Sequence, residues 1–373
     1  MKKIAFCLRD MQLGGVESVL CRTLEHLSDD KNFDITVVCF VDVSEPVYLD
    51  WFRAHPNIKR IVLYPSKIFG TKMPRFFLWR VIKHFCRDVY RFVRRYFVVH
   101  HLASFDTIID WHDFGFAKEF KKIKNVKKIA WFHSSISVFQ KRNFSQNLCV
   151  YDKIVVLTDD CLNFLIKQNP CCADKFVRVY NPIDVLRIRD MAIGGAIVDG
   201  DYFCCVSRMA YDKDIKTVLY AFDLFYKNHK NVKMVFVGGG DKLSVFQKYA
   251  NKLKSAQNIL FVGAQKNPYV YMAYAVANVL SSYGEGLPTV LLEAQVLNVL
   301  NISSNCKCGP REILMDGAAG MLFQPGDAVE LAKCMADVYD KNVDIDAMRN
   351  MATRGLVRFD SDAIMAQIKS LIS

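Results

Sequence analysis

The chain has 373 residues, of which 52% are hydrophobic and 24% charged, a composition that excludes a disordered protein and allows two domains of ordinary size. Its net charge of +12 suits an anionic partner such as nucleic acid, anionic lipid or a phosphorylated ligand. No apolar run reaches the roughly 18 residues of a membrane span, and Arg9 and Asp10 come too early for a signal peptide. We therefore expect a cytoplasmic protein.

The first half of the chain alternates short apolar segments with helix-period stretches. A helix is expected from Val16 to Leu27, and the segments expected as strands are 4–8, 35–41, 107–109, 129–132 and 154–157. Strands that alternate with helices predict a parallel sheet covered by helices on both faces. We expect one doubly wound domain over residues 1–184.

Polar residues and glycines follow several of these strands, at the ends where ligands of parallel sheets bind. Gly14 and Gly15 follow the first strand and allow the backbone to approach a ligand closely. The other candidates are Asp110, His112 and Asp113 after the strand at 107–109, and His133 after the strand at 129–132. The alternative is that the glycines form an ordinary turn and the histidine is structural.

Residues 74–99 predict a long helix with a basic side and a broad apolar and aromatic side. At about 100° per residue, an arc of roughly 120° holds His84 together with Arg80, Lys83, Arg87, Arg91, Arg94 and Arg95. Such a helix is typical of proteins that dock on anionic membranes, with arginines on the lipid headgroups. The alternative is an ordinary amphipathic helix packed on the sheet.

The strand and helix pattern restarts after Asn181-Pro182-Ile183-Asp184. The segments expected as strands are 203–207, 233–237, 259–262, 276–281 and 301–304. They predict a second doubly wound domain over residues 185–355, followed by a closing helix within 356–373. The predicted fold class is α/β, with two parallel sheets facing a central cleft where a ligand binds.

Two cations follow the strand at 203–207. Arg208 lies at its end and Lys213 comes five residues later, before a helix at 216–229. Together they suit a diphosphate, because arginine offers a planar fork and lysine a mobile point charge. Exposed solvated cations are the alternative. Asp212 and Asp214 form an Asp-x-Asp triplet, but Lys213 between them competes with a metal ion, and we expect no metal.

The loop after the strand at 276–281 carries Glu285, and the helix expected to start at Pro288 and Thr289 carries Glu293. The start of that helix offers free N–H groups to a phosphate. Glu285 would repel a phosphate beside it, so a sugar hydroxyl is its expected partner. The alternative is a turn glutamate followed by a solvated helical glutamate.

The chain resembles the retaining nucleotide-sugar glycosyltransferases of family 4 (the glycosyltransferase group 1 type), whose GT-B fold has two facing Rossmann-like domains. The likeness spans nearly the whole chain, and its motifs are Gly14-Gly15-Val16-Glu17, Trp131-Phe132-His133, Asn181-Pro182-Ile183-Asp184, Arg208 with Lys213, Val237-Gly238-Gly239-Gly240, and the stretch from Glu285 to Ala294. The chain departs from the family pattern at Asp214, where glycine is common, and at Asn298, Leu300 and Asn301, which replace Gly-x-Pro-Val.

The resemblance implies a donor site for a nucleoside-diphosphate sugar. Its residues would be Gly14, Gly15, Arg208, Lys213, Gly238, Ala264, Gln265, Glu285, Gly286, Leu287, Pro288, Thr289, Val290 and Glu293. Arg208 and Lys213 would bind the diphosphate, Glu293 the ribose, and Glu285 and His133 the sugar, which makes these two and the two cations the expected catalytic residues. Glu17, Asp110, His112 and Asp113 are the expected acceptor side.

The implied reaction transfers the sugar, with retention of configuration, to a hydroxyl of a glycan or lipid-linked acceptor. The expected setting is bacterial cell-surface polysaccharide or lipopolysaccharide synthesis, at the cytoplasmic face of the inner membrane, without metal or cofactor. A nucleotide-sugar epimerase or hydrolase of the same fold is the alternative. A nucleic-acid-binding protein is a more distant one, because the chain shows no recognisable nucleic-acid module.

Overall fold

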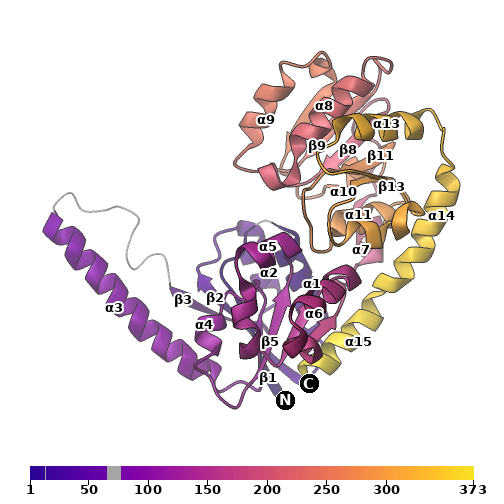
Figure 1. The fold of residues 1–373 in the computed structure, drawn as a ribbon. Coiled ribbons are helices and arrows are strands. Elements are labelled where there is room, and N and C mark those ends of the chain that lie inside the picture. Colours follow the sequence, from indigo (N-terminus) through magenta and orange to yellow (C-terminus); the bar gives the residue numbers. More distant parts are fainter. Residues whose placement is uncertain (13, 65–76) are drawn as a thin grey trace.

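The computed structural model describes residues 1–12, 14–64 and 77–373 and shows two α/β domains, each built on one parallel sheet (Figure 1). The first sheet has seven strands in the order β3-β2-β1-β4-β5-β6-β7. Their bounds are β1 (Lys2–Leu8), β2 (Phe33–Val41), β3 (Lys59–Tyr64), β4 (Thr107–Asp110), β5 (Lys127–Phe132), β6 (Lys153–Val156) and β7 (Phe176–Arg178). The strand order reverses between β1 and β4, and such a switch point opens a crevice at the carboxyl ends of the strands.

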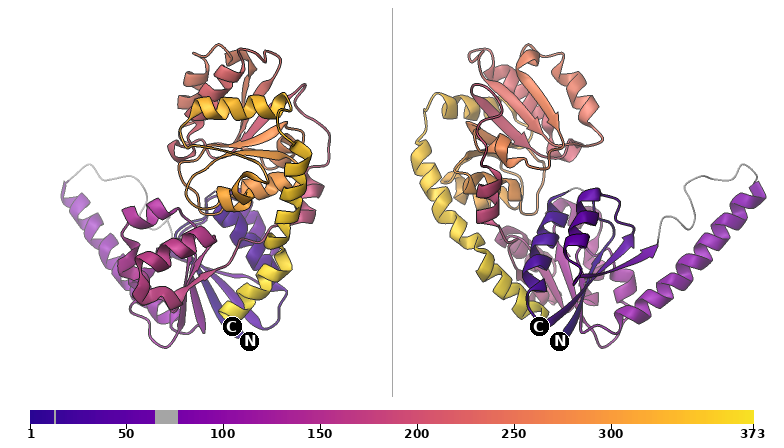
Figure 2. Two further views of the ribbon diagram at one scale, coloured as in Figure 1. Left: turned by 45° about the vertical axis from the view of Figure 1, so that its right-hand side comes forward. Right: turned by 180° about the vertical axis from the view of Figure 1, so that it is seen from behind.

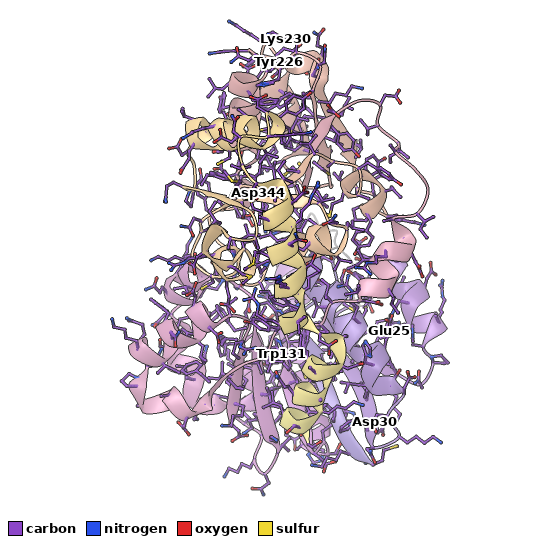
Figure 3. The ribbon with its side chains drawn as sticks, turned by 90° about the vertical axis from the view of Figure 1, so that its right-hand side faces the viewer. Glu25, Asp30, Trp131, Tyr226, Lys230 and Asp344 are labelled. Atoms are coloured by element: carbon purple, nitrogen blue, oxygen red, sulfur yellow. The ribbon has the colours of Figure 1, made fainter. Side chains whose placement is uncertain are left out.

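Helices cover both faces of this sheet, which is why the central strand β1 is fully buried from Ile4 to Leu8. The helices are α1 (Gly15–Ser28), α2 (Pro46–Ala54), α3 (Phe77–Leu102), α4 (Ala117–Phe120), α5 (Ile136–Lys141) and α6 (Asp159–Gln168). Trp111 and Trp131 pack in the core with ring centroids 4.7 Å apart, and Trp131 is labelled in Figure 3. This packing fixes the ends of β4 and β5, which carry predicted site residues.

The second sheet has six strands in the order β10-β9-β8-β11-β12-β13, and its order reverses between β8 and β11. Its strands are β8 (Tyr202–Val206), β9 (Lys233–Val237), β10 (Ile259–Gly263), β11 (Ala277–Leu280), β12 (Leu300–Ser304) and β13 (Met321–Phe323). Its helices are α7 (Val185–Met191), α8 (Ile215–Phe225), α9 (Leu243–Ala250), α10 (Tyr269–Met272), α11 (Thr289–Val296), α12 (Pro310–Ile313) and α13 (Ala328–Tyr339). The predicted fold of two doubly wound parallel sheets is confirmed.

The last two helices run from the second domain back to the first (Figure 2). After α14 (Ile345–Leu356), helix α15 (Ser361–Ile372) lies against the first domain. Ile368 and Ile372 are fully buried there, and Lys369 forms an ion pair of 2.9 Å with Asp30, which Figure 3 labels. The hydroxyl of Thr107 donates a hydrogen bond of 3.0 Å to the Ile372 carbonyl. The first domain is therefore completed by the end of the chain.

Helix α3 extends away from the first domain, and only its C-terminal end lies against the sheet (Figures 1 and 2). Arg94 donates hydrogen bonds of 2.8 and 3.0 Å to the carbonyls of Val62 and Leu63, and Arg95 forms an ion pair of 2.7 Å with Glu119. These two arginines, expected on lipid headgroups, bind the protein itself, because carbonyls of the edge strand β3 and the buried carboxylate of Glu119 lie within their reach. The side chains of Arg80, Lys83, Arg87 and Arg91 lie outside the described residues.

Candidate active site

A cavity of about 560 Å³ lies between the two domains, at the carboxyl ends of both sheets. It opens where the strand order reverses in each sheet, since β1 leads to Gly14 and Gly15, β8 to Arg208, and β11 to Glu285. The predicted residues that line it are Gly14, Gly15, Glu17, His133, Arg208, Lys213, Glu285, Gly286, Leu287, Pro288, Thr289 and Val290. The fold thus brings together twelve residues from distant parts of the sequence.

Two helix N-termini meet across this cavity. Helices α1 and α11 begin after Gly14 and Pro288, neither of which has a side-chain acceptor for the free N–H groups of the first turn. A Cβ atom placed on Gly15 would lie 3.9 Å from the Thr289 hydroxyl, so the two helix starts are neighbours. Both carry partial positive charge, and together they favour an anionic ligand between them.

Lys213 and Glu285 form an ion pair at the wall of the cavity, with 2.6 Å between Nζ and Oε1. Their side chains are only 17% and 12% exposed. The Ser281 hydroxyl donates hydrogen bonds to the carbonyls of Lys213 and Asp214, at 2.8 and 3.1 Å, and so ties the lysine loop to the end of β11. The ammonium group is therefore held at the cavity, beside the one carboxylate that an incoming anion must displace.

Arg208 is the more mobile of the two cations, because its side chain is 59% exposed and its contact with Asp212, at 3.4 Å, is also exposed. Asp214 is buried and accepts a hydrogen bond of 2.6 Å from the Thr217 hydroxyl. The two aspartates of the Asp-x-Asp triplet therefore make contacts within their own loop and the helix that follows it. In the parts of the chain that the structure describes, no group of three or more His, Cys, Asp or Glu side chains is placed to hold a metal ion.

His133 presents a neutral imidazole to the cavity. Burial lowers its pKa to about 3, with a smaller contribution from His112. Its ring packs 4.8 Å from that of Trp111, and among the described residues its buried Nε2 has no hydrogen-bond partner. The buried Oδ1 of Asn181, which also lines the cavity, is unpaired in the same way. Buried polar atoms normally have partners, so both atoms are available to a ligand.

Gly286 brings the two domains into direct backbone contact. A Cβ atom at this position would lie 2.0 Å from the carbonyl oxygen of His133, which no side chain can tolerate. A Cβ atom on Gly284, two residues earlier, would lie 3.1 Å from the side chain of Ser135. The absence of a side chain at position 286 is therefore what lets the loop after β11 close on the end of β5.

Glu293 lies one layer behind the cavity wall and is held by the first domain. Its Oε1 lies 3.5 Å from Nη2 of Arg22 in α1 and 3.4 Å from the hydroxyl of Tyr269. Burial raises the pKa of this carboxyl, and the charge of Arg22 opposes the shift. Both contacts use the same oxygen, so Oε2 remains for another partner.

Two of the predicted acceptor-side residues are used within the first domain. Asp110 is buried and accepts hydrogen bonds from the Phe116 amide at 2.7 Å and the Tyr151 hydroxyl at 2.6 Å. Asp113 accepts a hydrogen bond of 2.7 Å from the His133 amide and another from the Ser134 hydroxyl. Both carboxylates shape the loops beneath the cavity, and neither lines it.

The pair of His112 and Glu17 is the part of the predicted acceptor side that reaches the cavity. Glu17 lines the cavity, and its Oε1 lies 3.6 Å from Nε2 of His112, which is behind it. The amide of Arg9 donates a hydrogen bond of 3.3 Å to Nδ1 of the same histidine. This histidine therefore supports the glutamate from the side away from the ligand.

Besides Glu293, three residues expected at the donor lie outside the cavity lining, namely Gly238, Ala264 and Gln265. Gly238 has a φ of +142°, and a Cβ there would lie 1.9 Å from the Ser207 carbonyl oxygen, so this glycine lets β9 end against β8. Gln265 is exposed and donates a hydrogen bond of 2.7 Å to the Val262 carbonyl. Several residues of the lining had no predicted role: Gln12, Ser134, Ser135, Ser137, Asn181 and Tyr283. Ser134, Ser135 and Tyr283 come one to three residues after a predicted strand, which is the signal that identifies them.

Comparison with known proteins relates the second domain of this chain to a known family. Residues 187–355 match the family model described as Glycosyl transferases group 1. An uncharacterised glycosyltransferase of Methanocaldococcus jannaschii is 24% identical over 87% of this chain and 90% of its own length. The lipopolysaccharide 1,6-galactosyltransferase of Salmonella typhimurium is 28% identical over 40% of this chain and 42% of its own length.

Solved structures share the whole fold at low sequence identity. Anabaena HepE, solved in complex with UDP, has a TM-score of 0.75 and 17% identity over 99% of both chains. A variant of Staphylococcus aureus TarM, also solved with UDP, has a TM-score of 0.78 and 12% identity over the full length of both. The match of residues 187–355 assigns the second domain to the group 1 glycosyltransferases, and the likeness of the whole chain to these structures shows the GT-B fold.

Proposed function

We propose that the protein is a retaining glycosyltransferase that binds a nucleoside-diphosphate sugar in the cavity between its domains. The acceptor is a hydroxyl of a glycan or lipid-linked glycan in cell-surface polysaccharide or lipopolysaccharide synthesis. The observation that supports this most strongly is the meeting of two helix N-termini with Lys213 and Arg208 around one cavity. Relatives that make lipopolysaccharide support the acceptor class, and neighbours solved with UDP make uridine the first nucleotide to test.

The diphosphate is the natural ligand of the positive side of the cavity. On binding, it replaces Glu285 as the partner of Lys213, and the starts of α1 and α11 neutralise charge that develops on the leaving phosphate. These groups make the reaction independent of metal in this proposal. The released carboxylate of Glu285 then faces the sugar, where it stabilises the positive charge that develops at the anomeric carbon.

Retention of configuration requires the acceptor hydroxyl to approach the face from which the diphosphate departs. The bond from the anomeric carbon to phosphate oxygen breaks, the bond to the acceptor oxygen forms, and the acceptor proton passes to the departing phosphate. His133 is neutral and cannot serve as a cation, so its Nε2 exchanges a hydrogen bond with a sugar hydroxyl. The free oxygen of Glu293 accepts from the ribose hydroxyls.

We further propose that the enzyme works as a peripheral protein at the cytoplasmic face of a membrane, where a lipid-linked acceptor is presented. The net charge of +12 supports attraction to anionic lipid. Within residues 1–12, 14–64 and 77–373, no helix has the length and apolar character needed to cross a bilayer.

Thermal melting with nucleotides tests the donor site. We expect UDP or a UDP-sugar, in EDTA, to raise the melting temperature, because a ligand at a hundredfold excess over its Kd adds about 2.7 kcal/mol. Lys213→Ala removes a charge at the cavity and should lose most of the stabilisation. Lys230→Ala is the matched control, because it removes the same charge at the far end of the second domain, where Lys230 lies over the Tyr226 ring (Figure 3). Equal stabilisation of both variants would contradict the site.

Release of the nucleoside diphosphate separates transfer from hydrolysis. A transferase releases it rapidly only when an acceptor glycolipid is added, whereas a hydrolase of the same fold releases it equally without one. The anomeric configuration of the product, measured by NMR, then tests retention. A product of inverted configuration would contradict the proposed reaction.

A further inference from the structure

The outward side of α3 carries a continuous row of exposed apolar side chains, called here the apolar stripe. Its members and their exposed fractions are Val81 48%, Phe85 69%, Val89 45%, Phe92 72%, Val93 43%, Tyr96 67% and Phe97 59%. Steps of three and four residues place most of them on one side of the helix. From first to last they span about 24 Å of helix at 1.5 Å per residue.

The orientation of the stripe is fixed by the contacts of the helix with the first domain. Arg94 and Arg95 bond to the edge of β3 and to Glu119, while Val98 and Leu102 are buried in the core. At about 100° per residue, these four residues centre on a direction roughly 120° around the helix from that of Phe85, Phe92 and Tyr96. The helix therefore presents its aromatic side to the surroundings, and the stripe is a built surface rather than a loosely placed one.

A surface of this kind requires a partner. Single exposed apolar residues are normal on soluble proteins, but contiguous exposed apolar patches mark sites of contact with proteins, membranes or ligands. The stripe is straight and convex, which fits a flat surface such as a lipid bilayer.

Charge favours a bilayer over a second copy of this chain. Residues 77–102 contain six Lys and Arg and one Asp, so two copies of α3 packed side by side would bring like charges together. Arg94 and Arg95 bind the first domain, so the attraction to anionic headgroups rests on the other four, and each basic residue near such a surface contributes about 1 kcal/mol. An apolar aromatic side combined with a basic remainder is the pattern of helices that lie in the membrane interface.

We propose that the apolar stripe of α3 is the membrane-contacting surface of the protein and lies in the headgroup boundary of an anionic bilayer, with the helix axis along the surface. This proposal adds a membrane surface to the proposed function. The link between that surface and a lipid-linked acceptor rests on the proposed function. In this arrangement the aromatic side chains enter the bilayer, whereas Arg94 and Arg95 keep the helix attached to the enzyme.

Vesicle flotation tests the proposal. The vesicles contain three parts phosphatidylethanolamine to one part phosphatidylglycerol, and phosphatidylcholine vesicles serve for comparison. We expect the wild type to float with the anionic vesicles and the double variant Phe85→Ser, Phe92→Ser to bind more than about tenfold more weakly. The control variant Leu186→Ser, Val329→Ser changes two side chains of similar exposure, 76% and 70%, in the second domain and should bind as the wild type does.

Three results would overturn the proposal. Binding that is unchanged in the double variant would show that charge alone suffices, and binding of the wild type that is equal on phosphatidylcholine at any salt would remove the electrostatic part. A wild-type dimer in sedimentation velocity that the double variant dissociates, without vesicle binding, would assign the stripe to a second copy. Phe92→Lys alone, at the most exposed position, repeats the test with a smaller change.

Thermal stabilisation by UDP, measured on the same variants, tests the candidate active site independently of membrane binding. If the double variant keeps a single melting transition and its UDP response but loses vesicle binding, the stripe is the membrane surface. If UDP stabilises neither wild type nor variant, the proposed donor site fails, and the vesicle result still decides the role of the stripe.

Discussion

Asp110 is a buried carboxylic acid whose burial is only partly compensated. Burial raises its pKa from the ordinary 3.8 to about 7, although Tyr151 and the Phe116 amide hydrogen-bond one of its oxygens. Its other oxygen, Oδ1, has no hydrogen-bond partner in the part of the chain that the structure describes. Because the folded-state pKa lies above the unfolded one, the contribution of Asp110 to stability is fully present below about pH 4 and is lost as the pH rises through about 7.

We therefore predict that Asp110→Asn removes a pH dependence. For the wild type, this group lowers the free energy of unfolding by up to about 1.4 kcal/mol per pH unit across that window. As the pH rises from about 4 to about 7, the melting temperature of the variant should rise relative to that of the wild type. Asp30→Asn serves as the control, since the ion pair with Lys369 lowers the pKa of Asp30 and gives a dependence of the opposite sign. A constant difference between Asp110→Asn and wild type would refute the assignment.

At the scale of single elements, two departures from the family pattern fall at left-handed backbone positions. Asp214 and Asn298, which replace glycines, have φ of 46° and 59°. Asn298 follows α11, where the Val299 amide bonds to the Ala294 carbonyl at 2.9 Å and the Asn298 amide to the Gln295 carbonyl at 3.0 Å. These two bonds form a Schellman motif, whose αL position accepts Gly or Asn. The substitutions thus preserve the turns.

We predict that Asn298→Val lowers the free energy of unfolding by about 1–2 kcal/mol, because a β-branched residue is strained at positive φ. Asn298→Gly should leave it within about 0.5 kcal/mol or raise it slightly, because glycine adopts this conformation freely. Thermal melting measures both, at about 2–4 °C per kcal/mol for a domain of this size. If the valine variant has the same melting temperature as the wild type, the left-handed conformation at residue 298 does not restrict which residue is tolerated there.

The elements that a sequence reveals are those with strong periodicity. All ten segments expected as strands overlap strands of the structure, whereas β3, β7 and β13 were not foreseen. β3 and β13 lie at sheet edges and β7 at the other edge of the first sheet, where a strand is covered less completely and its apolar run is short. The helix of α3 was predicted, but the side that faces the protein was not, since that depends on carbonyls of β3 and on Glu119.

The candidate active site likewise has a part that the sequence predicts and a part that depends on tertiary packing. The strand-end argument places Arg208, Lys213 and Glu285 at the cavity, because the carboxyl ends of parallel strands share one edge of a sheet. It also suggests Asp110 and Asp113, whose bonds to loops of their own domain are set by tertiary packing. Contacts between domains, such as Arg22 with Glu293, leave no mark in a single sequence.

At the scale of the whole molecule, closure of the domains depends on Gly286. We predict that Gly286→Ala lowers kcat/KM by about a hundredfold, since a Cβ against the His133 carbonyl holds the reacting groups apart by at least an ångström. UDP should still stabilise the variant, because Lys213 and the start of α11 belong to the same domain as residue 286. Small-angle scattering should show a larger radius of gyration.

Gly284→Ala is the matched control, because its Cβ would lie 3.1 Å from Cβ and Oγ of Ser135, a contact that a shift of a few tenths of an ångström relieves, whereas the contact at residue 286 is 2.0 Å with backbone. We expect a much smaller loss of kcat/KM from this change. Equal losses in the two variants, or an unchanged scattering profile in Gly286→Ala, would show that backbone contact at this point does not govern closure.

The return of α15 to the first domain has a consequence for how the protein is made. Ile364, Met365, Ile368 and Ile372 belong to the same core cluster as residues of β1, β2 and α1. On the ribosome, the first domain therefore emerges early but keeps an open apolar face while the entire second domain is synthesised and folds. That face is sealed only after α15 has left the exit tunnel, so the two domains mature together and the nascent chain is vulnerable to aggregation and proteolysis until then.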